Sequence, residues 1–206
     1  MPQTLSEFAD WLDGRGAAWP SVPEIRPVKA TPFVEPLEGI KAVTWSIYGT
    51  LMRITDGQLT LEHPTRMRMQ VALEKTIREF NMWNSMIRKP GAPWEYLYSQ
   101  YTDLLSRQEL VGTGRTGDFP QVDAPGLWQV LVERLQENGY TYDESFHGDL
   151  EQFSEKVAWF FHSSLQGVTA APGAREAITV VARSSLAQAL LADAQPFTLV
   201  QLLRVL

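Results

Sequence analysis

The stretch that decides the expected fold is Lys41-Ala-Val-Thr-Trp-Ser-Ile-Tyr-Gly-Thr-Leu51. Its first half is rich in β-branched and aromatic side chains and carries no charge beyond its first residue, which is typical of a central parallel strand covered on both faces. Gly49 and Thr50 then mark a tight turn. Because ligands of open α/β sheets bind beyond the carboxyl ends of the strands, Ser46, Tyr48 and Thr50 are candidate site residues.

The segments that follow predict a second strand after a long helical insertion. Residues 63–167 carry apolar side chains at near-helical spacing, with helices expected over 64–86 (ended by Pro90-Gly91), 94–105, 128–135 and 150–165. Pro172-Gly173 opens another helix, residues 186–191 suit a strand, and a last helix follows Pro196. Since such crossovers are almost always right-handed, the two strands should be parallel neighbours.

The first 38 residues are expected to form a leader. A short amphipathic helix covers 4–13, with Gly14 as its cap, and five prolines between positions 20 and 36 predict a semi-rigid spacer outside the main core. The expected domains are therefore the leader 1–38, an α/β core of 39–56 and 168–206, and a helical cap of 57–167.

The amino-acid composition and net charge limit the kinds of fold and of binding partner that the chain can have. The chain has 206 residues, 44% of them hydrophobic, which suffices for one sizeable core without disulfides or metals, and it contains no cysteine. A net charge of -6 without a basic stripe argues against nucleic-acid and membrane partners. We find no targeting signal, so the cytoplasm is the default location.

The stretch 41–51 resembles the first signature of the haloacid dehalogenase-like (HAD) hydrolases. That signature is an apolar run, then Asp, two variable residues, Gly, Thr and an apolar residue, and Ser46 stands where the Asp belongs. The resemblance covers residues 40–53 and, more loosely, the order of elements from 172 to 206. It implies a partial Rossmann-like α/β core with parallel strands, a large helical cap insertion at the family's cap position and a chain that is mostly helical.

The same resemblance implies which chemistry is missing. The family's nucleophile is a carboxylate, and an unassisted serine hydroxyl is a much weaker one. Tyr48 resembles the dehalogenase branch, whereas most phosphatase members use a second Asp there as general acid and base. Loss of the carboxylate also weakens the Mg²⁺ site of the phosphatase branch, so no metal ligand is assigned and any cofactor stays open.

The second signature of the family is a strand that ends in Ser or Thr. Here Ala192 occupies the best-matching place, and its methyl group donates no hydrogen bond. Asp193 follows at the same crevice, as a ligand-binding residue or as a simple turn or helix cap. Gly49, Ala192 and Asp193 are the substrate-binding candidates at this edge.

Other motifs carry weaker signals. Residues 80–91 are dense in Met and Trp and form either a core stripe or a cap wall over the crevice, where Arg88 or Lys89 would hold an anion. Residues 112–117 have the spacing of a dinucleotide fingerprint, but a helix precedes them, which favours an inter-helix loop. The three histidines, at positions 63, 147 and 162, are far apart and form no metal-binding pair.

The expected function is that of a HAD-like protein with weak or no hydrolase activity that binds a small anionic ligand. Two alternatives stay open: an active hydrolase of altered mechanism whose remaining motifs lie beyond Leu206, and a non-enzymatic scaffold whose helical cap binds a protein partner. The family's third and fourth signatures, a Lys and an acidic pair, have no room in these residues. Both a piece of a longer protein and a reduced family member would fit this. We expect the piece, because the sequence stops inside an apolar helix after Pro196 and would leave its hydrophobic surface uncovered.

Overall fold

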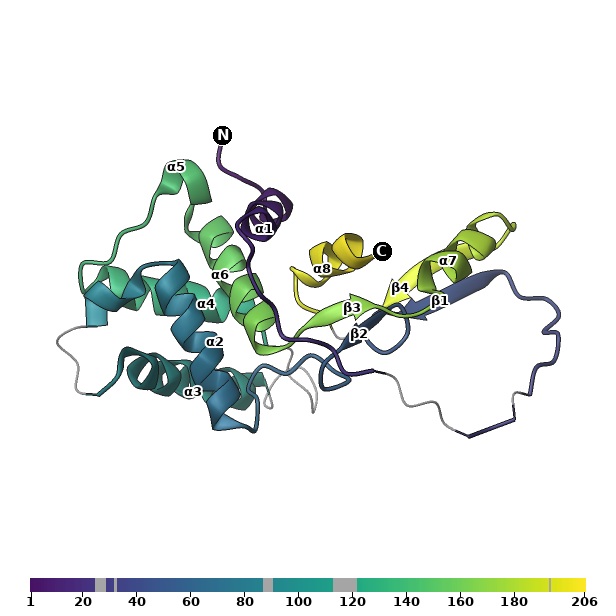
Figure 1. Cartoon of the computed structure of the whole chain (residues 1–206), viewed down its shortest axis with the longest axis horizontal. Coiled ribbons are helices and arrows are strands. Elements are labelled where there is room, and N and C mark those ends of the chain that lie inside the picture. Colours follow the sequence, from purple (N-terminus) through teal and green to yellow (C-terminus); the bar gives the residue numbers. More distant parts are fainter. Residues whose placement is uncertain (25–28, 32, 87–90, 113–121, 193) are drawn as a thin grey trace.

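The computed structural model is a mixed α/β structure, about 52% helical. It describes residues 1–24, 29–31, 33–86, 91–112, 122–192 and 194–206. Figure 1 shows two parts: a helical body made of α2 to α6, and a slender arm that carries β1, β4 and α7, with α1 and α8 between them. No described helix is long and apolar enough to cross a bilayer.

The arm contains the predicted parallel pair. β1 (Ala42–Ser46) lies beside β4 (Ala187–Leu191) in the same direction, with Ala42 opposite Ala187 and Ser46 opposite Leu191. The prediction of parallel neighbours is therefore confirmed. α7 (Ala174–Ala182) leads into β4, as the Pro172-Gly173 signal indicated.

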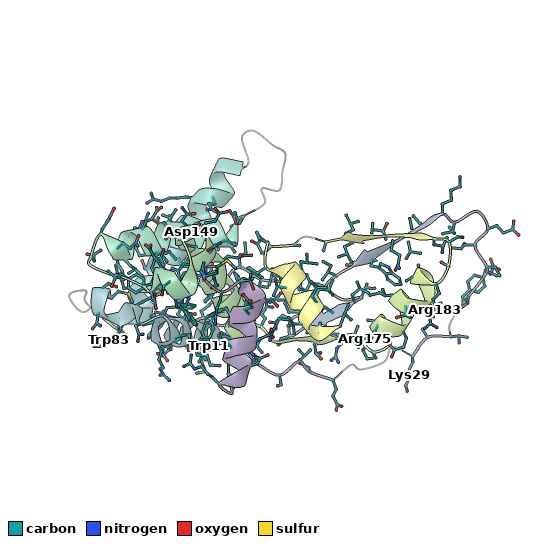
Figure 2. The ribbon with its side chains drawn as sticks, turned by 90° about the horizontal axis from the view of Figure 1, so that it is seen from above. Trp11, Lys29, Trp83, Asp149, Arg175 and Arg183 are labelled. Atoms are coloured by element: carbon teal, nitrogen blue, oxygen red, sulfur yellow. The ribbon has the colours of Figure 1, made fainter. Side chains whose placement is uncertain are left out.

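The expectation that this sheet is central and covered on both faces is wrong. Among the described residues the sheet has two strands, and every residue of β4 is exposed, with Leu191 at 69%. In β1 exposed residues alternate with half-buried ones. The composition of a strand indicates how much it could bury, whereas its actual burial depends on the elements that pack against it. Here the described helix α7 runs along the pair (Figures 1 and 2) and leaves β4 exposed.

A second, antiparallel pair joins the arm to the helical body, and the sequence patterns missed it. β2 (Met52–Ile54) pairs with β3 (Val168–Ala170), so that the insertion begins and ends at one place. Just beyond the pair, the Thr55 N–H donates to the Gly167 carbonyl at 3.1 Å, and the Gly167 N–H donates to the Thr55 hydroxyl at 3.1 Å. Strands of three residues are too short for the alternation of polar and apolar residues to appear.

The helical body is built around α6 (Leu150–Leu165), whose side chains from Phe153 onward are almost all buried. The helices around it are α2 (Arg66–Glu79), the 3-10 helix η1 (Met82–Met86), α3 (Pro93–Gly112), α4 (Ala124–Gln136) and α5 (Glu144–His147). Phe161 of α6 packs against Trp128 and Tyr101, each with ring centroids 5.2 Å apart. A helix buried on all sides marks the centre of a core, and the expected helical character of 63–167 is confirmed.

The helix expected over 64–86 is interrupted. α2 ends at Glu79, Asn81 adopts a left-handed φ of 52°, and η1 follows. Asparagine tolerates this conformation better than most residues do. The chain therefore turns here although no glycine or proline in the sequence indicates a turn. Met82 and Met86 remain buried, which is why their spacing looked like a continued helix.

The N-terminal helix belongs to the main core. α1 (Leu5–Gly14) begins with a capping box between Thr4 and Glu7 and buries Leu5, Phe8, Ala9 and Leu12 in the same cluster as α6. Gly14, expected as its cap, is instead its last residue; Arg15 is the C-cap, and Gly16 follows with φ of 75°. Its Asp10 and Asp13 pair with Arg204 of α8 (Thr198–Val205).

The spacer after α1 divides into two parts. Its first residues lie on the helical body, where Trp19 packs edge-on against Trp159 with centroids 5.3 Å apart. The described residues from 33 to 40 are exposed. The expectation of a spacer outside the core therefore holds for its second half only.

The close approach of this spacer to the strand junction gives a stability prediction. A Cβ added at Gly167 would lie 1.7 Å from the Pro20 carbonyl oxygen, whereas one added at Gly14 meets nothing within 4 Å. We expect Gly167→Ala to destabilise the protein by about 1–3 kcal/mol. The control Gly14→Ala should be neutral or stabilising by at most about 1 kcal/mol. Urea unfolding measures both changes, and equal stabilities would contradict the packing of Pro20 on Gly167.

Candidate functional site

The turn after β1 presents small polar groups at the carboxyl end of the sheet. Ile47 and Leu51 are buried in the small core of the arm, while Ser46, Gly49 and Thr50 face solvent. The turn is closed by bonds from the Leu51 N–H to the Ser46 and Ile47 carbonyls and from the Gly49 N–H to the Met52 carbonyl. Gly49 has φ of 86°, which a residue with a side chain adopts only under strain, and the space around it is open.

Ser46 ends the strand with an exposed, unactivated hydroxyl. Its Oγ donates to the Tyr48 carbonyl at 3.2 Å. No described histidine, aspartate or glutamate is hydrogen-bonded to it, so nothing among these residues is placed to remove its proton.

Tyr48 was predicted to be a site residue at the carboxyl end of β1, but its hydroxyl is hydrogen-bonded to α8. It donates to Gln201 Oε1 at 3.1 Å and lies 3.0 Å from the Thr198 hydroxyl, which in turn accepts from the Gln195 N–H at 3.0 Å. Burial raises the pKa of Tyr48 to about 12. The phenol is therefore protonated near neutral pH and acts as a tether between the turn and α8, which the sequence pattern did not indicate.

The second-signature position lies beside the first. Because Ser46 is opposite Leu191, Ala192 comes one residue beyond the end of the shared register. Ala192 is half-buried against the small core of the arm and brings no hydroxyl. The other ligand-binding candidates, Asp193, Arg88 and Lys89, lie outside the described residues, as do residues 113–117 of the glycine-rich motif.

The described groups at this edge do not fit Mg²⁺. Ser46, Tyr48 and Thr50 offer hydroxyl and carbonyl oxygens but no carboxylate, which Mg²⁺ sites in proteins usually contain. More widely, the described part of the chain has no group of three His, Cys, Asp or Glu residues able to hold a metal.

A polar cluster at the strand junction was not predicted. Gln166, which is 1% exposed, accepts from the Thr60 N–H at 2.8 Å and donates to Asp56 Oδ2 and to the Gln58 carbonyl, each at 3.0 Å. Asp56 also accepts from Arg68 at 3.0 Å. Burial alone would raise the pKa of Asp56, but the bonds from Gln166 and Arg68 outweigh it and hold that pKa below its usual value.

The three histidines contact residues of the helical body and of the strand junction. His63 lies beside Asp56, with Nε2 and Oδ2 3.4 Å apart, and accepts from the Thr65 N–H just before α2. His162 is buried in α6 and stacks on Phe197, and burial lowers its pKa to about 3. Burial also lowers the pKa of His147 to about 4. His147 and His162 are therefore neutral near pH 7.

A cavity of about 140 Å³ lies between α1, α6 and α8, away from the turn. Gln201, the acceptor of the Tyr48 hydroxyl, is one of its lining residues, whereas Ser46, Gly49 and Thr50 are not. The strand end, where the sequence analysis placed the ligand, is therefore separate from this cavity.

The Tyr48 tether gives a pH-dependent prediction. In the unfolded chain a tyrosine ionises near pH 10, and in the folded protein near 12, so the stability from Tyr48 is present below pH 10 and is lost as the pH rises toward 12. Between pH 8 and pH 11 the wild type should lose on the order of 1 kcal/mol more than Tyr48→Phe. Urea unfolding at both values measures this difference, and equal losses would show that the hydroxyl is not buried in the folded protein.

Comparisons of the chain with protein-family models, with curated proteins and with solved structures each found no match.

Proposed function

We propose that this chain is a HAD-like protein that keeps the family's strand-and-turn frame and lacks its nucleophile, and that it binds a small anionic ligand without hydrolysing it. The observation that carries the proposal is the position of Ser46. It ends β1 in parallel register with β4 and precedes a turn with a left-handed Gly49, at the place where the HAD signature has its aspartate.

The chemistry of the turn supports binding over turnover. Ser46 donates its hydrogen bond to a carbonyl and meets no base among the described residues, so it is a poor nucleophile. Gly49 leaves the backbone open to a close-approaching ligand, and the exposed Thr50 adds a side-chain hydroxyl as a hydrogen-bond donor. None of the described residues at this edge is a carboxylate that would repel a small anion, and the Thr50 hydroxyl can donate a hydrogen bond to one.

A second candidate function, a non-enzymatic scaffold, is favoured by the exposed apolar groups of the arm and of α8. Leu191 of β4 is 69% exposed, Val180 of α7 67% and Leu203 of α8 70%. Exposed apolar patches often mark protein interaction sites. These three residues lie on the arm and on α8, whereas the sequence-based alternative placed the partner on the helical insertion.

Substitution of the nucleophile position tests the proposal. We expect wild-type protein to show no turnover of p-nitrophenyl phosphate with Mg²⁺ or of 2-chloropropionate, and Ser46→Asp to raise 2-chloropropionate hydrolysis at least about tenfold above background, because it supplies the attacking carboxylate. Ser46→Asn is the matched control, with the same shape and no charge. Release of chloride and of p-nitrophenol measures the rates.

The outcomes separate the candidates. Turnover by the wild type that Ser46→Asn abolishes would show an active enzyme of altered mechanism. If Ser46→Asp and Ser46→Asn both show only background rates, position 46 does not correspond to the position of a nucleophile. The scaffold would then be the favoured function.

A further inference from the structure

We infer that Asn138 is a deamidation site that the folded end of α4 protects, and that its modification turns a transient opening of this end into a lasting one. Asn138 and Gly139 follow the last residue of α4, Gln136, after one intervening residue, and they form the only Asn-Gly pair in the sequence. Both are exposed to solvent. The inference does not depend on the proposed function, because α4 belongs to the helical body and not to the arm (Figure 1).

The reaction needs water as its only other reactant. The backbone nitrogen of Gly139 loses its proton and attacks the side-chain carbonyl carbon of Asn138. A new C–N bond closes a succinimide ring, the bond to the side-chain nitrogen breaks, and that nitrogen leaves as ammonia with the proton. Water then opens the ring at either carbonyl and gives aspartate or isoaspartate. Glycine favours the attack, because no side chain hinders the approach of its nitrogen.

The folded end of α4 holds both reacting groups in hydrogen bonds. The Gly139 N–H, which carries the attacking nitrogen, donates to the Gln136 carbonyl at 2.9 Å. The side-chain amide of Asn138, the leaving group, donates from Nδ2 to the Arg134 carbonyl at 2.7 Å. Since the nitrogen must lose its proton and the side chain must turn toward it, both bonds have to break before the ring closes.

Tyr140 ties this helix end to the core. Its N–H donates to the Leu135 carbonyl at 3.0 Å, and together with the bond from Gly139 to Gln136 this gives the pair of bonds of a Schellman motif. Its side chain is 6% exposed, and its hydroxyl donates to the Phe80 carbonyl at 2.7 Å. An opening that frees Gly139 therefore also loosens a buried side chain, which keeps the open form rare.

The product does not fit the closed helix end. A carboxylate at position 138 has no hydrogen to donate, so it would leave the Arg134 carbonyl without this bond and place a negative charge beside it. The carboxyl end of a helix already carries partial negative charge, and Glu137 precedes the site in the chain. Isoaspartate also lengthens the backbone of the turn. A chain that has reacted while open is therefore unable to restore the original closed end.

The first test compares the folded and the unfolded wild-type chain at about pH 8. Deamidation at Asn138 should be at least about tenfold faster in urea, because the folded chain reacts through its rare open form. Peptide mapping by mass spectrometry counts the aspartate and isoaspartate formed at this position. Asn81, which Met82 follows, is the internal reference in urea and should react more slowly than Asn138, because a side chain hinders the attacking nitrogen.

The second test loosens the anchor without touching the reacting residues. Tyr140→Phe removes the hydroxyl that bonds to Phe80, and we expect Asn138 to deamidate at least about threefold faster in this folded variant, the effect of one hydrogen bond on the opening. In urea its rate should equal that of the wild type. Tyr142→Phe is the matched control: it loses the same hydroxyl two residues further on, where no hydrogen bond to the described residues is present, and it should keep the wild-type rate.

The third test examines the product. Asn138→Asp should lower the protection of the Gly139 and Tyr140 amides against hydrogen exchange at least about threefold. Gln136→Glu is its control, because it adds the same charge at the same helix end and keeps the donor of Asn138; it should lose less protection.

Four results would overturn the inference. They are equal rates at Asn138 in the folded and the unfolded wild type, no reaction at Asn138 in urea, a folded Tyr140→Phe chain that reacts at the wild-type rate, or wild-type protection in Asn138→Asp. The first two are read on the wild-type chain, so they hold even if a variant fails to fold. None of them bears on Ser46, whose test measures hydrolysis.

Discussion

The antiparallel contact between β2 and β3 is the constraint on which the rest of the structure depends, because it holds together the two ends of the helical insertion. Met52 lies opposite Ala170. The Thr55 N–H donates to the Gly167 carbonyl, and the Thr55 hydroxyl accepts from the Gly167 N–H. Once these ends are fixed, the short segment that contains α7 is enough to bring β4 beside β1 in the parallel direction. The entropy of closing so long a loop grows only slowly with its length, and the core of the insertion offsets it.

Most of the stabilisation lies in the helical body. α6 is buried along nearly its whole length and contacts α1, α2 and α4, and each large apolar side chain that it buries contributes roughly 1.5–3 kcal/mol. The arm, by contrast, has a small core that consists of Ile47, Leu51, Met52, Ala174 and Leu202. Two exposed strands over such a core open more easily than the helices do, so hydrogen exchange in β1 and β4 should be faster than in α6.

The sequence predicted the elements that have a long or strongly patterned signal. The parallel pair, the helices and the turn at Gly49 followed from apolar spacing and from glycine and proline positions. What it missed depends on contacts between distant residues. β4 is exposed because too little of the chain packs against it. The helix breaks near Asn81 because of one left-handed backbone angle. The β2–β3 pair consists of strands too short to show an alternation of polar and apolar residues. The bonds of Tyr48 to α8 are tertiary contacts with no local sequence pattern.

Tyr48 shows how the turn and α8 constrain each other. Its hydroxyl reaches Thr198 and Gln201, and α8 is in turn tied to α1 through Arg204. The surroundings of that hydroxyl are neutral and largely buried, so an aspartate at position 48 would have a shorter side chain and a charge with no described partner. A tyrosine at this position holds α8 to the turn, and an aspartate would lose that tether. Under the proposed function, the serine at position 46 and the tethered tyrosine at position 48 would both favour binding over hydrolysis.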